Sequence, residues 1–222
     1  MTAKTVVAFD LYGTLLSTES IAKQLEKHCD NAKAQSISAL WRRYQLEYTW
    51  RLNSMGRYED FSVITCNSLL HALAENNEQL SDDNIEHLMQ AYDSLSTFSD
   101  VNPALAHIGA DPIIQAVIFS NGTKTMVSNS VLRSKDLSPH ASVFQDIVTR
   151  SRQVKDPSRM SKLRLISGNP FDIVGARATG MQAIWVDRVG AGWKDAVAPD
   201  LQPTGIVHSL EHIMNEIHCH RL

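Results

Sequence analysis

Short apolar runs that end in polar residues constrain the fold of this chain more than any other feature. The first spans Thr5 to Phe9, similar runs lie at 113–119 and 183–186, and weaker candidates lie at 163–166 and 146–148. A run that is apolar at every position suits a parallel sheet, because helices cover both faces of such a sheet. Stretches with helical spacing separate these runs. We therefore predict an α/β fold around a parallel sheet.

One long segment, from Ser17 to Asp100, lacks strand-like runs. Apolar and aromatic residues recur there at the spacing of a helix face, as at positions 37, 40, 41, 44 and 48. Ser81, and Ser17 or Thr18, precede amphipathic stretches and can cap helices, since a side-chain oxygen accepts from the amides of a first turn. The sequence predicts a helical domain at 17–100, inserted into a core domain formed by 1–16 and 101–222.

The overall composition favours a packed enzyme that acts on small molecules. The chain has 222 residues, 43% of them hydrophobic, and a formal net charge of -3. Without a basic stripe or a block of like charges, neither nucleic acid nor a membrane surface is expected as a partner. Three widely spaced cysteines suit reduced thiols in a cytoplasmic protein. Neither a secretion signal nor an apolar run of roughly 18 residues is visible.

Two C-terminal segments carry no evident chemistry. Residues 208–220 are predicted to form a closing helix, and the glycine- and proline-containing stretch 190–203 is predicted to form a surface loop. The histidines at 107, 140, 208, 212, 218 and 220 are not paired with carboxylates at metal-site spacing. We therefore expect no metal site there, and we place His212 and His218 on an exposed helix.

The strongest local signal is the segment from Phe9 to Leu15, with the sequence FDLYGTL. It places Asp10 at the carboxyl end of the first strand, the edge at which ligands of open α/β sheets bind. Gly13 permits a tight turn there. A carboxylate held beside backbone amides and the Thr14 hydroxyl can attack an electrophilic carbon and form an ester, which splits a difficult displacement into two steps. The alternative is an aspartate that only caps a turn.

Two further polar segments follow predicted strands. Ser120, Asn121 and Gly122 come after the run at 113–119, and the sequence SGNPFD at 167–172 comes after the run at 163–166. Ser-Asn-Gly alone is a common turn composition. Its position after a buried strand nevertheless places it at the same sheet edge as Asp10.

These segments together resemble the motifs of the haloacid dehalogenase superfamily, and in detail those of its type II branch, the L-2-haloacid dehalogenases. The helical insertion adds to the resemblance, because SALWRRYQLEYTW at 38–50 is similar to the cap of that branch. The resemblance spans nearly the whole chain. It implies a doubly wound parallel sheet, a Rossmann-like core, with a helical cap inserted after the first strand and the active site between them.

The resemblance also implies a role for each motif residue. Asp10 would attack C2 of a short L-2-haloacid, invert that carbon and expel halide, and water would then hydrolyse the ester to release a 2-hydroxyacid. Arg42 would receive the halide, for which a guanidinium suits because it stays charged and presents several donors. The alternative for Arg42 is a solvated arginine on an amphipathic helix. The remaining implied catalytic residues are Thr14 and Ser167 near the nucleophile, Ser120 at the substrate carboxylate, Asn169 in the surrounding hydrogen bonds, and Lys155 and Asp172 at the hydrolytic water.

A substrate pocket is implied by further matching positions. Apolar lining would exclude water from the first displacement, although each apolar residue could equally belong to the core. Arg43 stands where the family commonly has a neutral polar side chain, which would change the halide or acid accepted. The residues expected to bind substrate are Leu11, Tyr12, Arg43, Leu46, Phe61, Asn121 and Phe171.

Two positions argue against the metal-dependent chemistry of the superfamily's phosphatases. Those enzymes carry a second aspartate two residues after the nucleophile, where it acts as general acid and helps to hold magnesium. Here that position is Tyr12, and Asn169 stands where phosphatases usually carry an acid. We therefore expect neither a metal nor an organic cofactor, and a magnesium-dependent phosphatase is the alternative enzyme.

The resemblance weakens around Lys155. The family has a tyrosine six residues after its lysine, but this chain has Ser161. Only eleven residues separate Lys155 from Ser167. Roughly four of them are needed for the strand before Ser167, which leaves about seven, whereas a helical crossover between parallel strands takes about a dozen or more. Lys155 could pair with Asp10 and Asp172 or be a loop lysine, and a shortened crossover leaves open a non-catalytic binding protein. Since family members are often dimers, a homodimer is expected.

Overall fold

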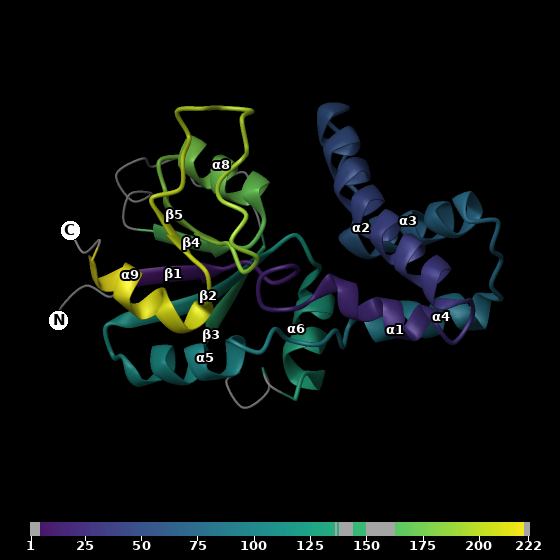
Figure 1. Ribbon diagram of the computed structural model, residues 1–222, viewed down its shortest axis with the longest axis horizontal. Helices are drawn as coiled ribbons and strands as arrows, with labels where there is room; N and C mark the ends of the chain where they lie inside the picture. The colour runs from purple at the N-terminus through teal and green to yellow at the C-terminus, as the bar shows by residue number, and fades with distance from the viewer. Residues whose placement is uncertain (1–4, 136, 138–143, 150–162, 220–222) are drawn as a thin grey trace. The chain divides into compact units, whose positions relative to one another are not determined.

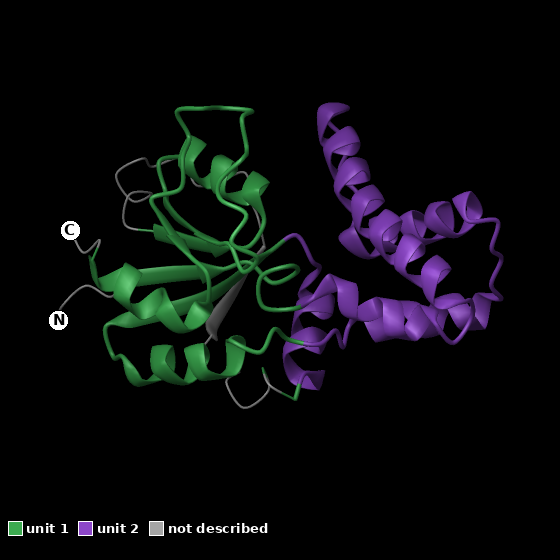
Figure 2. Ribbon diagram, in the orientation of Figure 1, with its two compact units in different colours: residues 1–16, 97–120, 135–222 green, residues 17–96, 121–134 purple. Residues whose placement is uncertain are grey.

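The computed structural model describes residues 5–135, 137, 144–149 and 163–219 (Figure 1). By their contacts the residues group into two units, coloured in Figure 2. The first contains 1–16, 97–120 and 135–222, and the second contains 17–96 and 121–134. The domain limits expected from the sequence, with an insertion at 17–100, stay a prediction.

The first unit is built on a six-stranded sheet with the order β3-β2-β1-β4-β5-β6. Every neighbouring pair in this sheet is parallel. The strands are β1 (Thr5–Phe9), β2 (Ile114–Ser120), β3 (Phe144–Thr149), β4 (Leu163–Ser167), β5 (Gln182–Val186) and β6 (Gly205–Val207). The parallel α/β architecture predicted from the apolar runs is therefore confirmed.

The predicted strands agree with the observed ones to within a few residues. β1 matches its run, while β2 begins and ends one residue later than the run at 113–119. The weak candidate at 146–148 forms the centre of β3. Only β6 was not predicted, because a strand of three residues following a long loop gives no periodic signal.

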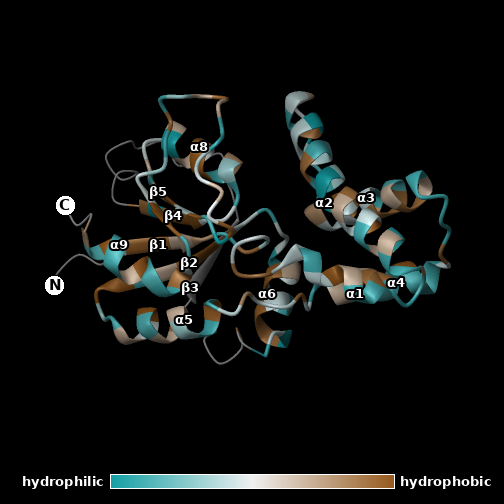
Figure 3. Cartoon of the chain, in the orientation of Figure 1, coloured by the Kyte–Doolittle hydropathy of each residue, from teal (hydrophilic) through white to brown (hydrophobic). Residues whose placement is uncertain are grey.

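Helices flank this sheet on both faces, as the resemblance implied for a doubly wound fold (Figure 1). Helix α8 (Pro170–Ala178) packs on the face that presents Ala8, Val117 and Leu165. Helices α5 (Val101–Ala110) and α9 (Ile213–Cys219) lie on the opposite face in the view of Figure 1. Between these layers, strands β1, β2, β4 and β5 carry mainly hydrophobic colours in Figure 3, which explains why their runs lack polar alternation.

The second unit is helical over its described residues. It contains a 3-10 turn, η1 (Thr18–Ile21), and helices α1 (Ala22–Leu25), α2 (Asn31–Ser54), α3 (Phe61–Glu75), α4 (Asp82–Tyr92) and α6 (Lys124–Arg133). The Ser81 cap is confirmed, since its side chain accepts from the Asn84 amide. The cap expected at Ser17 or Thr18 was wrong: Ser17 precedes η1 without a side-chain cap, and Thr18 is the first residue of η1. The Ser17 carbonyl instead accepts from the Ser20 hydroxyl.

A buried polar cluster joins three of these helices. The Trp41 indole donates to the Thr65 carbonyl at 2.8 Å, and the Gln45 amide donates to the Thr65 hydroxyl at 3.0 Å. The Tyr92 hydroxyl donates to Gln45 Oε1 at 2.9 Å. Because an unpaired polar group in a core is costly, these bonds fix the register of α2 against α3 and α4.

The closing segment differs in detail from the expected single helix. A 3-10 turn, η3 (Leu210–His212), precedes α9, and the Ser209 side chain accepts from the Glu211 amide at its start. Residues 190–203 form the expected loop, and His212 and His218 are exposed as predicted. In the part of the chain that the structure describes, no helix combines the length and apolarity needed to cross a bilayer.

Candidate active site

Three strand ends bring the predicted motifs to one edge of the sheet. Asp10 directly follows β1, Ser120 ends β2, and Ser167 ends β4. β1 lies between β2 and β4, with Phe9 opposite both Ile118 and Ile166. The chain reverses its direction of winding at this point of the sheet, which is where open α/β sheets bind ligands.

A tight turn after Asp10 folds the FDLYGTL segment back on itself. The amides of Leu15 and Leu16 both donate to the Leu11 carbonyl, and the Gly13 amide donates to the Leu16 carbonyl at 2.7 Å. Gly13 has a φ of 90°, a conformation that other residues rarely adopt. A Cβ at Gly13 would also lie 2.9 Å from Asn169 Oδ1. The predicted tight turn is confirmed, and it requires glycine.

Asp10 is only 5% exposed, and its carboxylate is held from two directions. The Thr14 hydroxyl donates to Asp10 Oδ2 at 2.8 Å, and Asn169 Nδ2 donates to the same oxygen at 2.9 Å. One donor comes from the turn after β1 and the other from the segment after β4. The two bonds therefore fix the carboxylate plane relative to both central strands.

The hydroxyl protons of this cluster can be assigned from their partners. Thr14 commits its proton to Asp10 and accepts from the Gly168 amide at 2.9 Å. Ser167 commits its proton to Asp172 Oδ2 at 3.0 Å and accepts from the Asn169 amide at 3.0 Å. Thr14 Oγ1 and Ser167 Oγ lie 3.4 Å apart, and neither hydroxyl has a second proton to donate across this contact.

The Asn169 amide connects the two buried carboxylates. Its Nδ2 lies 2.9 Å from Asp10 Oδ2, 3.0 Å from the Tyr12 carbonyl and 3.3 Å from Asp172 Oδ2. All three partners are acceptors, so only the amide nitrogen can face them and the opposite flip is excluded. Because two N–H bonds serve three acceptors, the longer contact to Asp172 shares a proton.

Gly168 lets the two site segments approach closely. A Cβ there would lie 2.5 Å from the Gly13 carbonyl oxygen, a distance that side-chain-bearing residues do not tolerate. The Gly168 carbonyl accepts from the Trp185 indole at 3.2 Å, which ties this segment to β5. The paired glycines thus bring the Asp10 turn against the segment after β4.

Five of the predicted catalytic residues form one hydrogen-bonded cluster: Asp10, Thr14, Ser167, Asn169 and Asp172. Ser120, 1% exposed, ends the neighbouring strand β2. Leu11 and Tyr12 are buried in the turn, and Phe171 lies in the first turn of α8. Lys155 and Ser161 lie outside the described residues, as does the chain between β3 and β4.

The other predicted residues belong to the second unit. Arg42, Arg43 and Leu46 lie on α2, Phe61 begins α3, and Asn121 follows β2. Arg42 and Leu46 are partly buried, and Phe61 is buried. The roles expected for these residues stay predictions.

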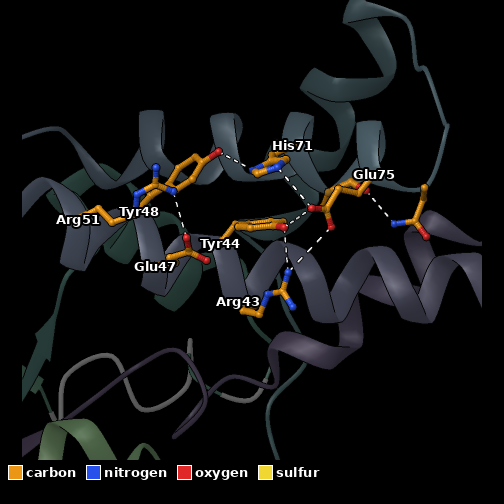
Figure 4. A network of polar contacts seen from close by, with 9 residues as sticks. Arg43, Tyr44, Glu47, Tyr48, Arg51, His71 and Glu75 are labelled. Atoms are coloured by element: carbon orange, nitrogen blue, oxygen red, sulfur yellow. Dashed lines mark hydrogen bonds and ion pairs between the residues drawn. The ribbon is translucent and has the colours of Figure 1, made fainter.

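Arg43 takes part in a polar network between α2 and α3 (Figure 4). Its guanidinium donates to the Tyr44 hydroxyl at 2.9 Å, and that hydroxyl donates to Glu75 at 2.5 Å. His71 stacks on the Tyr44 ring and pairs through Nδ1 with the Tyr48 hydroxyl at 2.7 Å. The hydrogen bond to Glu75 raises the pKa of Tyr44, so this phenol stays protonated.

Sequence reasoning missed a second polar cluster in the first unit. Asp187 follows β5 and is 2% exposed. Burial alone would raise its pKa, but amides of Gly192 and Ala191 donate to the carboxylate at 2.8 and 3.0 Å, and the net pKa is lowered. Arg188 beside it forms an ion pair with Asp100. A charged residue after a predicted strand, the signal that identified Asp10, was also present at Asp187.

The arrangement around Asp10 suits covalent chemistry at carbon. A buried carboxylate of fixed orientation is a competent nucleophile when hydrogen-bond donors orient it without transferring a proton to it. Asp172 is a second buried carboxylate, linked to the first through the Asn169 amide. One carboxylate can therefore form an ester while the other orients water.

Comparisons with known proteins give named relatives. Haloacetate dehalogenase H-2 of Moraxella sp. (strain B) is 30% identical over 198 residues, which cover 83% of this chain and 86% of the relative. An (S)-2-haloacid dehalogenase of Pseudomonas fluorescens is 30% identical over 220 residues, 93% of each chain. The L-2-haloacid dehalogenase structure from Xanthobacter autotrophicus with chloropropionic acid covalently bound has a TM-score of 0.81 at 22% identity and covers 98% of this chain and 100% of that one. No family model matches the chain.

A parallel sheet of this order, an aspartate after its first strand and a helical insertion just beyond define a protein of the haloacid dehalogenase fold. The fold expected from the motifs is confirmed. Within that class the relatives at 30% identity, aligned over most of their length, decide the family. The chain belongs to the (S)-2-haloacid dehalogenase family.

Proposed function

We propose that this protein hydrolyses the carbon–halogen bond of short L-2-haloacids to give 2-hydroxyacids through an Asp10 ester. One observation carries the proposal: the Asp10 carboxylate is buried at the carboxyl edge of the sheet and oriented by Thr14 and Asn169. The relatives named for haloacid dehalogenation support the choice of substrate class.

The first step is a displacement at C2 of the acid. An Asp10 carboxylate oxygen forms a bond to C2 from the side opposite the halogen, and halide leaves with the bonding electron pair, so C2 is inverted. No proton moves in this step. Burial of Asp10 favours it, because a carboxylate stripped of water is a stronger nucleophile than a hydrated one.

The second step returns Asp10 to its starting state. Water adds to the ester carbonyl carbon, and the bond from that carbon to the oxygen now attached to C2 breaks. One proton of the water passes to that departing oxygen, and the other is released to solvent. The original Asp10 oxygen therefore leaves on the 2-hydroxyacid, and the water oxygen stays on the enzyme. Asp172 is proposed to orient the water, with Ser167 and Asn169 holding Asp172 in place. Lys155 is proposed to assist on the strength of its motif alone.

Recognition of the acid is assigned by motif position. Ser120 at the end of β2 is proposed to bind the substrate carboxylate. Arg42 and Asn121 are proposed to receive the halide, and the remaining proposed pocket residues are Leu11, Tyr12, Arg43, Leu46, Phe61 and Phe171. A homodimer and a cytoplasmic location are also proposed, on the resemblance and the cysteine content.

The reaction is proposed to need no metal. A divalent cation would require oxygen ligands beside Asp10, as hard cations do. The group found there is Asn169 Nδ2, whose N–H bonds point at Asp10, Asp172 and the Tyr12 carbonyl. An N–H donor repels a cation at that position, so the donor set does not fit magnesium.

An isotope experiment tests the ester intermediate. The enzyme in excess is mixed with L-2-chloropropionate in ¹⁸O-water containing a chelator, and a single turnover is followed. The expected result is unlabelled lactate of inverted configuration and a protein heavier by one ¹⁸O atom, located by peptide mass spectrometry at Asp10. Labelled lactate with unlabelled protein would instead mean that water attacks C2 directly, and the ester mechanism would be wrong.

The rival functions give different results in the same tests. A phosphatase would release phosphate from phosphate esters only with magnesium present and would leave the haloacid untouched. A non-catalytic binding protein would bind the acid without releasing halide or incorporating ¹⁸O.

The proposed halide role of Arg42 predicts a selective loss of rate. Arg42→Lys should lower kcat about 100-fold, because an ammonium cannot present the planar set of donors to the departing halide. Arg51→Lys is the matched control, since Arg51 lies on the same helix, is exposed and pairs with Glu47. We expect that control to keep kcat within about threefold of wild type. Chloride release under saturating substrate measures kcat of both variants. If the two variants lost kcat equally, Arg42 would have no specific role in the mechanism.

A further inference from the structure

Arg188 connects an ion pair to the turn that carries Thr14. Its Nε and Nη2 donate to the two Asp100 carboxylate oxygens at 2.9 Å each, which is a bidentate pair. The same Nη2 donates to the Thr14 carbonyl at 2.9 Å. Both Nη2 protons are therefore used, one on the carboxylate and one on the turn.

The pair itself is held in a fixed position. Asp100 is 7% exposed and also accepts from the Leu210 amide at 2.9 Å. The Arg188 guanidinium lies over the Phe98 ring, 4.0 Å from its centroid. A bidentate, stacked and largely buried arginine has little freedom to shift, so it can hold a neighbouring group in place.

The group that it holds is next to the nucleophile. Thr14 is fully buried, and its hydroxyl donates to Asp10 Oδ2 at 2.8 Å. The Thr14 carbonyl is anchored by Arg188 while the hydroxyl orients Asp10. A movement of the Thr14 backbone would thus be passed on to the carboxylate.

The same site lies where the chain leaves and re-enters the first unit. Leu16 pairs with Thr97 in an antiparallel bridge, and the Phe98 amide donates to the Leu15 carbonyl. Arg188 contacts the outgoing segment through Thr14 and the returning segment through Asp100. It therefore fixes both ends of the insertion to the end of β5.

We propose that Arg188, clamped by Asp100, is a positioning residue that holds Thr14 so that its hydroxyl orients the Asp10 nucleophile. The inference rests on the proposed function for its kinetic consequence, but the mechanical claim can be tested without activity. Arg188 touches neither the substrate nor the reacting atoms in this scheme, because it acts through Thr14.

Hydrogen exchange tests the mechanical claim. In Arg188→Lys the charge is kept but the fork is lost, and the Gly168 amide, which donates to Thr14 Oγ1, should exchange about 10-fold faster. The Asp10 amide, bonded to the Ile166 carbonyl in the adjoining strand β4, is the internal control and should change less than about twofold. Unchanged exchange at Gly168, or equal acceleration at both amides, would overturn the proposal.

Kinetics test the consequence for the reaction. Arg188→Lys should lower kcat about 10-fold with KM within about twofold, because a misplaced nucleophile affects the chemical step. Asp100→Asn should show the same pattern, and Arg177→Lys, whose guanidinium donates to the Met181 carbonyl, should keep wild-type kcat. In a Thr14→Val background the Arg188→Lys change should cost less than about twofold.

The outcomes separate this inference from the proposed function. A tenfold kcat loss that persists in the Thr14→Val background would mean a general structural effect and would overturn the positioning role. Wild-type kcat in Arg188→Lys would overturn it as well. If the wild-type protein released no halide, the proposed function would fail, and the exchange of Gly168 against Asp10 would still decide whether Arg188 holds the turn.

Discussion

Asp10→Asn is expected to abolish chloride release from L-2-chloropropionate, with a loss of at least about 10⁴-fold in kcat. An amide oxygen carries no charge and cannot form the ester at C2, so the step that breaks the carbon–halogen bond has no nucleophile. The substitution keeps the volume of the side chain and an oxygen that accepts from Thr14 and Asn169. The fold should therefore survive, which far-ultraviolet circular dichroism and thermal unfolding can verify.

The measurement is free chloride, followed in the presence of a chelator at saturating substrate. Asp200→Asn is a suitable control, because Asp200 lies in the loop after β5 and is exposed, and its kcat should not change. If Asp10→Asn released chloride at even a tenth of the wild-type rate, another group would have to attack the carbon. If the Asp10→Asn variant gained activity over hours, its mass should be measured, because deamidation of the new asparagine would regenerate the aspartate.

The cluster around Asp10 was accessible to sequence reasoning because each of its parts is local. Asp10 and Ser167 directly follow buried strands, and strand ends are recognisable from continuous apolar runs. Parallel strands bring such ends to one edge. The side chains of Thr14, Asn169 and Asp172 then reach the same place through short turns. The resemblance of the motif at 167–172 to that of the haloacid dehalogenases was what identified Asn169 and Asp172.

The Arg188 clamp could not be predicted in the same way. Its partners Asp100 and Thr14 are separated from it by 88 and 174 positions, and charged pairs at such distances have no sequence period. β6 was missed because three residues are too few for a pattern. The Ser17 cap failed because a 3-10 turn precedes α1, and a candidate cap residue does not reveal which kind of turn will follow.

We propose that Asn169, which stands where a metal-binding site of this fold would carry an acid, lets this cluster do without a cation. The amide supplies protons to two carboxylates and a carbonyl, so it neutralises part of their repulsion without a cation. A carboxylate in that place would turn three attractive contacts into repulsive ones. We therefore propose that the identity of this one side chain decides whether the cluster is stable alone or needs a metal.

Asn169→Asp is expected to lower kcat at least about 10³-fold at pH 7.5 and to reduce the free energy of unfolding by about 2–4 kcal/mol. The variant places a third carboxyl group beside Asp10 and Asp172, two buried acids that Asn169 now bridges. Like charges and burial both raise the folded-state pKa of the introduced carboxyl above its unfolded value of about 4. The destabilisation is therefore full above the folded-state pKa and disappears as the pH falls below the unfolded value.

Urea unfolding at pH 7.5 and 5 measures the difference in the free energy of unfolding between wild type and the variant. This difference should be smaller at the lower pH. Asn169→Leu is the matched control, because it removes the amide without adding charge, and its deficit should not depend on pH in this way. Magnesium chloride should raise the melting temperature of Asn169→Asp and not that of wild type, since the variant offers carboxylate and carbonyl oxygens together. A variant as stable as wild type at pH 7.5, with no response to magnesium, would show that Asn169 does not face the two carboxylates.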